Sequence, residues 1–133
     1  GGRVTLEGLP ERFQPGERYI LTSRLRAEET TVAGYQLAAR YAEGPDAGRN
    51  AGSLELVDDR SALGDSLGIV YAHHAQPGVR TTDPSGSSWA VSWTAPVATY
   101  PVAFHLTANS GNGDDSPLGD LVFTHSIVLE PGQ

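Results

Sequence analysis

Histidine is the residue type in this sequence best able to bind a transition metal, because the chain has four histidines and no cysteine. Imidazole nitrogen suits zinc, copper and haem iron. His73 and His74 are adjacent, so on an extended strand they point to opposite faces and do not readily share one ion. His105 falls on the polar side of its segment and His125 on the apolar side, so the two are not expected to meet. We therefore favour structural or surface roles for all four over ligand roles.

The stretch 109–120 is a second candidate site, because it is rich in Asn, Asp, Ser and Gly. Calcium takes about six to eight oxygen ligands, and a pliable polar loop can supply them. The ligands predicted here are Asp114, Asp115 and Asp120, with Asn109 and Asn112. The spacing departs from an EF-hand loop, since no Asp opens it and no Glu closes it. The alternative, which we favour, is a long turn whose Asp side chains bond to their own backbone.

Patterns typical of catalytic sites are weaker than these two candidate metal sites. The sequence has no Gly-x-Ser-x-Gly elbow to mark a serine nucleophile and no glycine-rich phosphate loop. The acidic pairs Asp58-Asp59 and Asp114-Asp115 suggest glycoside hydrolysis, which needs two carboxylates across a cleft. Both pairs lie in turn-like sequence, where neighbouring carboxylates are usually solvated. The sequence therefore predicts a protein that is not an enzyme.

The charge balance bears on possible partners. Nine arginines, no lysine and sixteen acidic residues give a formal charge of −7. Such a field repels nucleic acid and anionic membrane surfaces, which bind through cationic side chains. Arg24, Arg26 and Arg40 lie on outward faces of neighbouring predicted strands, where they could pair with acidic groups of a partner. A solvated arginine face is the alternative that we favour.

The elements that hold these residues are predicted to be strands, because most segments alternate apolar and polar residues with a period of two. Turn signals such as Pro15-Gly16 and Pro77-Gly78 separate the segments. Seven or so strands without a helical pattern favour an antiparallel β-sandwich over a barrel or an α/β fold. The predicted strands are 4–7, 19–26, 35–41, 54–56, 89–93, 100–106 and 121–129.

Three segments need a separate prediction. Residues 61–67 are the one candidate for a helical turn, weakened by Gly64. Segment 121–129 is apolar on both faces, which predicts a covered or central strand. Trp89 and Trp93 share one face of one strand, where we expect them to fill the space between two sheets rather than form a stacking platform for a sugar.

Length and hydropathy limit the class further. At 133 residues and 14.0 kDa, the chain is predicted to form one domain, 1–133. No apolar run approaches the ~20 residues of a membrane helix, so we predict a soluble chain without membrane insertion. Because the sequence does not begin with Met, Gly1 is expected to be a processed terminus or the edge of a longer chain.

Several short stretches, spread over nearly the whole sequence, resemble one family. The chain is similar to reeler (reelin N-terminal) domains and their bacterial relatives, the choice-of-anchor V domains. An aromatic residue followed shortly by His, here Tyr71 and His73, also fits them. The stretches that carry the resemblance are Val4 to Pro10 with Phe13, Pro15-Gly16 and Tyr19; Gly34 to Leu37; Ala51 to Leu54; Trp89 to Pro96; and Val102 to Phe104, leading through Asn109 and Asn112 to Asp120.

The resemblance implies an immunoglobulin-like sandwich of about seven to nine strands. It also implies a place outside the cytoplasm, in a surface or matrix protein, and no catalytic role. Animal members carry disulfides that this chain cannot form, which favours a bacterial relative. Bacterial members often have a haem-attaching Cys-x-x-Cys-His segment upstream, which this sequence lacks. Haem would then come only through a partner chain, with His73 as its candidate axial ligand.

From the residues and the resemblance together, we predict a non-catalytic extracytoplasmic module for binding or assembly in a bacterial surface or periplasmic complex. Its partners would be other proteins of that assembly, bound by end loops or by an edge strand. One alternative is an accessory subunit packed beside a c-type cytochrome. Another is a calcium-dependent adhesin or lectin that uses the loop 109–120. No cofactor is predicted with certainty.

Overall fold

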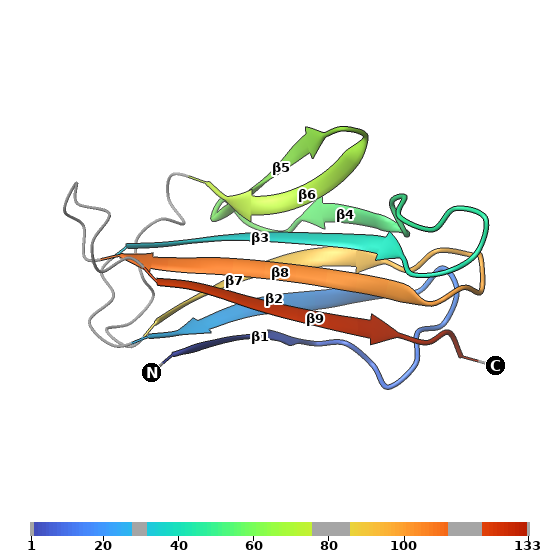
Figure 1. The fold of residues 1–133 in the computed structure, drawn as a ribbon, viewed down its shortest axis with the longest axis horizontal. Coiled ribbons are helices and arrows are strands. Elements are labelled where there is room, and N and C mark those ends of the chain that lie inside the picture. Colours follow the sequence, from blue (N-terminus) through green and yellow to red (C-terminus); the bar gives the residue numbers. More distant parts are fainter. Residues whose placement is uncertain (1, 28–31, 76–85, 112–120, 133) are drawn as a thin grey trace.

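Nine strands in two antiparallel sheets make up the computed structural model, which describes residues 2–27, 32–75, 86–111 and 121–132 (Figure 1). The sheets lie face to face, which confirms the predicted all-β sandwich. Sheet I contains, in spatial order, β1 (Arg3–Glu7), β2 (Arg18–Arg26), β7 (Gly86–Thr94) and β4 (Ser53–Leu56). Sheet II contains β5 (Ser61–Ser66), β6 (Ile69–His74), β3 (Val32–Tyr41), β8 (Val102–Gly111) and β9 (Leu121–Leu129).

The period-two alternation of the sequence places one face of each central strand in the core. Strands β2 and β7 pair in sheet I, and β3 and β8 pair in sheet II. Their inward side chains bury the apolar area that drives the sheets together. The buried inward residues include Leu21 and Leu25 of β2, Tyr35 and Leu37 of β3, Trp89, Val91 and Trp93 of β7, and Val102, Phe104 and Leu106 of β8.

Both tryptophans belong to this core. Trp89 stacks on Tyr35 from the opposite sheet, with ring centroids 4.6 Å apart. Trp93 meets the ring of Phe104 edge to face at 4.8 Å, and its indole N–H donates to the carbonyl of Ala51 at 2.9 Å. The indoles are 1% and 0% exposed, which confirms core packing and excludes a surface stacking platform.

The predicted helical turn at 61–67 is wrong, because residues Ser61–Ser66 form strand β5. Leu67 and Gly68 both have positive φ, 53° and 80°, and this tight turn folds the chain back into β6. Gly64, which argued against a helix, lies opposite Tyr71, and the tyrosine ring occupies the space that a Cβ would fill. Glycine at position 64 therefore leaves room for the Tyr71 ring across the hairpin.

The prediction of a covered or central strand at 121–129 is also wrong. Strand β9 is an edge of sheet II and pairs only with β8 among the described strands. Val122 and Val128 on its outward face are 68% and 58% exposed, whereas Leu129 is buried. β-branched residues suit a pleated strand even where one face meets solvent. Apolar residues on both faces therefore reflected strand propensity here, not burial. None of the described segments forms a helix that could cross a bilayer.

Candidate binding groove

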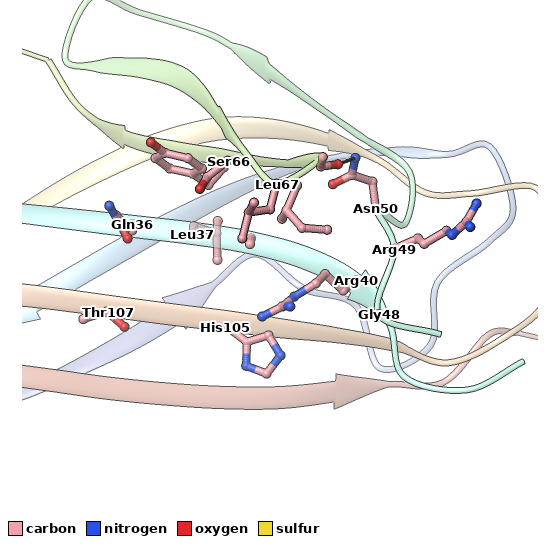
Figure 2. A pocket seen from close by; sticks show the side chains of 14 residues that line it. Gln36, Leu37, Arg40, Gly48, Arg49, Asn50, Ser66, Leu67, His105 and Thr107 are labelled. Atoms are coloured by element: carbon pink, nitrogen blue, oxygen red, sulfur yellow. Dashed lines mark hydrogen bonds between the residues drawn. The ribbon is translucent and has the colours of Figure 1, made fainter. Parts of the chain in front are cut away.

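A groove of about 1050 Å³ opens on the outer face of sheet II (Figure 2). Its floor comes from outward residues of β3 and β8, and one wall comes from the turn that joins β5 to β6. The segment 48–50 closes one end. We call this site the groove; it is lined by Gln36, Leu37, Ala38, Arg40, Gly48, Arg49, Asn50, Ser66, Leu67, Gly68, Ile69, Tyr71, His105 and Thr107.

The wall carries an unusual residue, Leu67, at the tip of the β5–β6 hairpin. Two successive positive φ angles are typical of the two-residue hairpin turn that fits the twist of the strands, and they favour Asn or Gly. Leu67 adopts φ 53° although its Cβ disfavours this region by about 1 kcal/mol or more. Its side chain is also 101% exposed, so no packing within the chain compensates for the strain. Backbone strain without an internal reason suggests a functional one.

Asn50 holds the hairpin tip in place. Its side-chain amide donates to the carbonyl of Gly68 at 2.9 Å, and its side-chain oxygen accepts the N–H of Val70 at 3.0 Å. The segment around Asn50 is itself fixed along the end of β3, since Tyr41 N–H donates to the carbonyl of Arg49 at 2.9 Å. The wall and the closed end of the groove are thus joined by hydrogen bonds before any ligand arrives.

The floor of the groove is cationic. Arg40 extends over the sheet toward His105, while Arg49 lies at the closed end (Figure 2). The Arg40 Nε is buried and has no hydrogen-bond partner. His105 is exposed, and its Nδ1 lies 3.3 Å from the Ser126 hydroxyl oxygen of β9. No Asp or Glu from the described ranges lines the groove.

The structure separates the three arginines that the sequence placed on neighbouring outward faces. Arg24 and Arg26 lie on β2 in sheet I, whereas Arg40 lies on β3 in sheet II. They therefore belong to opposite outer faces of the sandwich. Arg24 already pairs with Glu7 at 3.1 Å. Each of the three lies on an outward face, as predicted, but consecutive strands β2 and β3 belong to different sheets, so the arginines do not share one surface.

The adjacent histidines are engaged with the backbone. His74 Nδ1 accepts the N–H of Tyr35 at 3.2 Å, where the pairing of β6 with β3 has ended. His73 Nδ1 lies 2.9 Å from the His74 carbonyl oxygen and donates to it, because a carbonyl only accepts. These contacts support structural roles. The haem-ligand role of His73 stays a prediction.

The calcium prediction falls mostly outside the described residues, because Asn112, Asp114, Asp115 and Asp120 lie in 112–120. Asn109 belongs to β8 rather than to the loop. Its side-chain oxygen lies over Gly34, beside the ring of His74. The described part of the chain holds no group of three His, Asp or Glu that could bind a metal. Calcium binding at 109–120 therefore stays a prediction.

Of the acidic pairs, Asp58 and Asp59 are exposed, and the Asp58 carboxylate accepts the N–H of Arg60 at 2.9 Å. This is the bond of an Asx turn and fits the turn interpretation. Sequence reasoning missed the groove, apart from assigning Arg40 to an outward face. The turn at its wall has Gly at only one of its two positions, so the usual hairpin signal was weak.

Comparisons with known proteins show where the fold occurs. The human F-spondin reeler domain (fragment 2) matches 98% of this chain and 92% of its own at 20% identity, with a TM-score of 0.60. The Reelin-N domain of F-spondin matches at 19% identity with a TM-score of 0.59, over 99% of this chain and 86% of its own. A cohesin module from a Clostridium perfringens family 33 glycoside hydrolase matches 98% of this chain and 96% of its own, at 17% identity and a TM-score of 0.61.

At these identities the likeness shows a shared fold. The predicted resemblance to reeler domains is confirmed at the level of the fold, and the chain shares this fold with a cohesin module as well. No protein-family model matches the sequence. No curated protein matches it either.

Proposed function

We propose that this chain is a non-catalytic binding module of an extracytoplasmic assembly and that it binds a partner protein in the groove. The observation that carries the proposal is Leu67, an apolar side chain that is fully exposed on a strained turn at the rim. A residue chosen for folding alone would be Asn or Gly at this position. Contact with a partner protein would account for an exposed leucine at this strained position.

The fold supports the same function. Reeler and cohesin modules with this sandwich occur as parts of larger proteins, and one of them belongs to a glycoside hydrolase. Rigid sheets with a groove held by hydrogen bonds suit recognition, because little conformational entropy is lost when the ligand binds. A place at the surface or in the periplasm is proposed on the same likeness.

The proposal is tested with Leu67→Asn. Asn tolerates positive φ, so this variant is expected to be about 1 kcal/mol more stable than wild type, measured by urea unfolding. The same change is expected to weaken capture of a partner protein from the extracytoplasmic fraction of the source cells by about ten-fold, because it removes the exposed apolar contact. A variant that is more stable and binds less separates function from folding.

Val97→Asn is the matched control, because Val97 is 81% exposed and lies outside the groove. It should leave capture unchanged. Equal capture by wild type and Leu67→Asn would overturn the groove as the binding site. Hydrolysis of glycans or esters at an enzyme-like rate would overturn the non-catalytic role.

A further inference from the structure

The groove is positively charged, whereas the chain as a whole is negatively charged. The whole chain has a formal charge of −7, with sixteen acidic residues. Yet two arginines, Arg40 and Arg49, line the groove, and no acidic residue of the described ranges faces it. A cationic site on an acidic protein has a local potential opposite to the overall field. It therefore selects for local negative charge rather than for a large polyanion.

Among the described residues that line the groove, Arg40 is the one with a buried side-chain nitrogen that has no hydrogen-bond partner. It sits on β3, where Ala38 pairs with His105, so Arg40 and His105 are diagonal neighbours on the outer face. The Nε of Arg40 is buried without a partner. A charged group with an unpartnered buried donor is costly, and a carboxylate that pairs with the terminal nitrogens of the guanidinium would offset this cost without reaching Nε itself.

The neighbours of Arg40 indicate what else the ligand carries. Leu67 and Ile69 form an apolar wall, and Gln36 and Thr107 add neutral polar groups to the floor. A peptide can place an apolar side chain on Leu67 next to a carboxylate at Arg40. An acidic sugar has no comparable apolar side chain to cover this wall. Tyr71 is the one Phe, Tyr or Trp residue among the described lining residues. Both tryptophans are in the core, so neither offers a face on which a sugar ring could stack.

We propose that the groove binds an acidic segment of a partner protein, in which a carboxylate is held by Arg40 beside His105 and an adjacent apolar side chain rests on Leu67. This inference rests on the proposed function and adds the chemistry of the ligand. Arg49 adds a second positive charge at the closed end, although its side chain points away from Arg40 (Figure 2). The ligand is thus a short stretch that alternates acidic and apolar residues.

The test uses isothermal titration calorimetry with two blocked peptides, (Glu-Leu)₃ and (Gln-Leu)₃. Wild type is expected to bind the Glu peptide at least about ten-fold more tightly, because a guanidinium forms stronger hydrogen bonds with a carboxylate than with a neutral amide. The preference should shrink as salt rises from about 0.05 M to about 0.3 M, since the Debye length falls. Arg40→Gln should lower the affinity for the Glu peptide by about ten-fold and leave that for the Gln peptide unchanged.

Arg26→Gln is the matched control. It removes the same charge from the outer face of sheet I, so any effect of net charge alone appears in both variants. Arg40→Lys keeps the charge but loses the planar fork, and it should recover part of the affinity. Because the Arg40 Nε is buried, a substitution there can also destabilise the fold, so thermal unfolding of each variant is measured alongside binding. His105→Gln changes an exposed residue of the same floor and should also weaken binding of the Glu peptide.

Two results would overturn the inference: equal affinity for both peptides, or equal loss in Arg26→Gln and Arg40→Gln. An Arg40-dependent affinity for trigalacturonate that exceeds the affinity for the Glu peptide would also overturn it and assign the groove to an acidic sugar. Failure of the inference is distinguishable from failure of the proposed function. If Arg40→Gln captures the cellular partner as wild type does while Leu67→Asn does not, the groove remains a binding site with a different ligand chemistry.

Discussion

Tyr35 illustrates how a single polar atom is accommodated in the core. The side chain is 2% exposed, stacks on Trp89, and shares a hydrogen bond of 2.5 Å with the Ser61 hydroxyl. Burial disfavours the phenolate and raises the pKa of Tyr35 from 10.0 to about 12, although the hydrogen bond with Ser61 opposes this. The folded protein therefore resists ionisation of a residue that ionises readily once unfolded.

The free energy of unfolding should therefore depend on pH through Tyr35. Because the folded pKa of Tyr35 is above the unfolded one, its contribution to stability is complete below about pH 10 and is lost as the pH rises through about 12. A shift of this size corresponds to about 2 to 3 kcal/mol. Urea unfolding at about pH 9 and about pH 11 should show a fall in the free energy of unfolding, which Tyr35→Phe should reduce. An identical pH dependence in Tyr35→Phe would contradict the assignment.

Unlike the hydroxyl of Tyr35, the buried hydroxyl of Ser23 has no hydrogen-bond partner. It lies on the inward face of β2, opposite Trp89 of β7. Desolvating a hydroxyl without a partner costs about 1 kcal/mol or more. Ser23→Ala should therefore raise the free energy of unfolding by roughly 1 kcal/mol, measured by urea titration. A clear loss of stability would mean that the hydroxyl has a partner, such as a bound water.

Among the elements, the β5–β6 hairpin is held by a residue outside it, Asn50. Asn50 closes both ends of the turn through bonds to Gly68 and Val70. Asn50→Ala should cost about 1 to 2 kcal/mol of stability and speed hydrogen exchange at the Val70 amide. Asn50→Asp keeps the acceptor for Val70 and loses the donor to Gly68, so it should protect the amide better than Ala. Unchanged exchange in both variants would show that the strands alone hold the turn.

The elements also show what the sequence could predict. Strands with one buried face, such as β2, β3, β7 and β8, were predicted because alternation reports burial directly. β5 and β6 were both missed, because the turn that joins them has Leu where Asn or Gly gives the hairpin signal. The edge position of β9 was missed because strand order depends on long-range pairing, which a local pattern does not contain. For the same reason the sequence did not show that Arg40 lies on a different sheet from Arg24 and Arg26.

At the scale of the whole molecule, aromatic contacts between the sheets make the sandwich one cooperative unit. Trp89 of sheet I stacks on Tyr35 of sheet II, and Trp93 packs against Phe104 of sheet II. Neither sheet keeps its buried face without the other. Scanning calorimetry should therefore give a calorimetric enthalpy equal to the van't Hoff enthalpy. Two separate transitions would show that the sheets unfold independently.

The bond from the Trp93 indole to the carbonyl of Ala51 has a further consequence. Ala51 directly follows Asn50, so a core chromophore is one residue away from the closed end of the groove. A ligand that shifts this segment alters the polarity around the indole N–H, to which its emission wavelength is sensitive. A change in Trp93 emission when an unlabelled ligand is added would therefore report occupancy of the groove and would allow ligands to be screened by fluorescence.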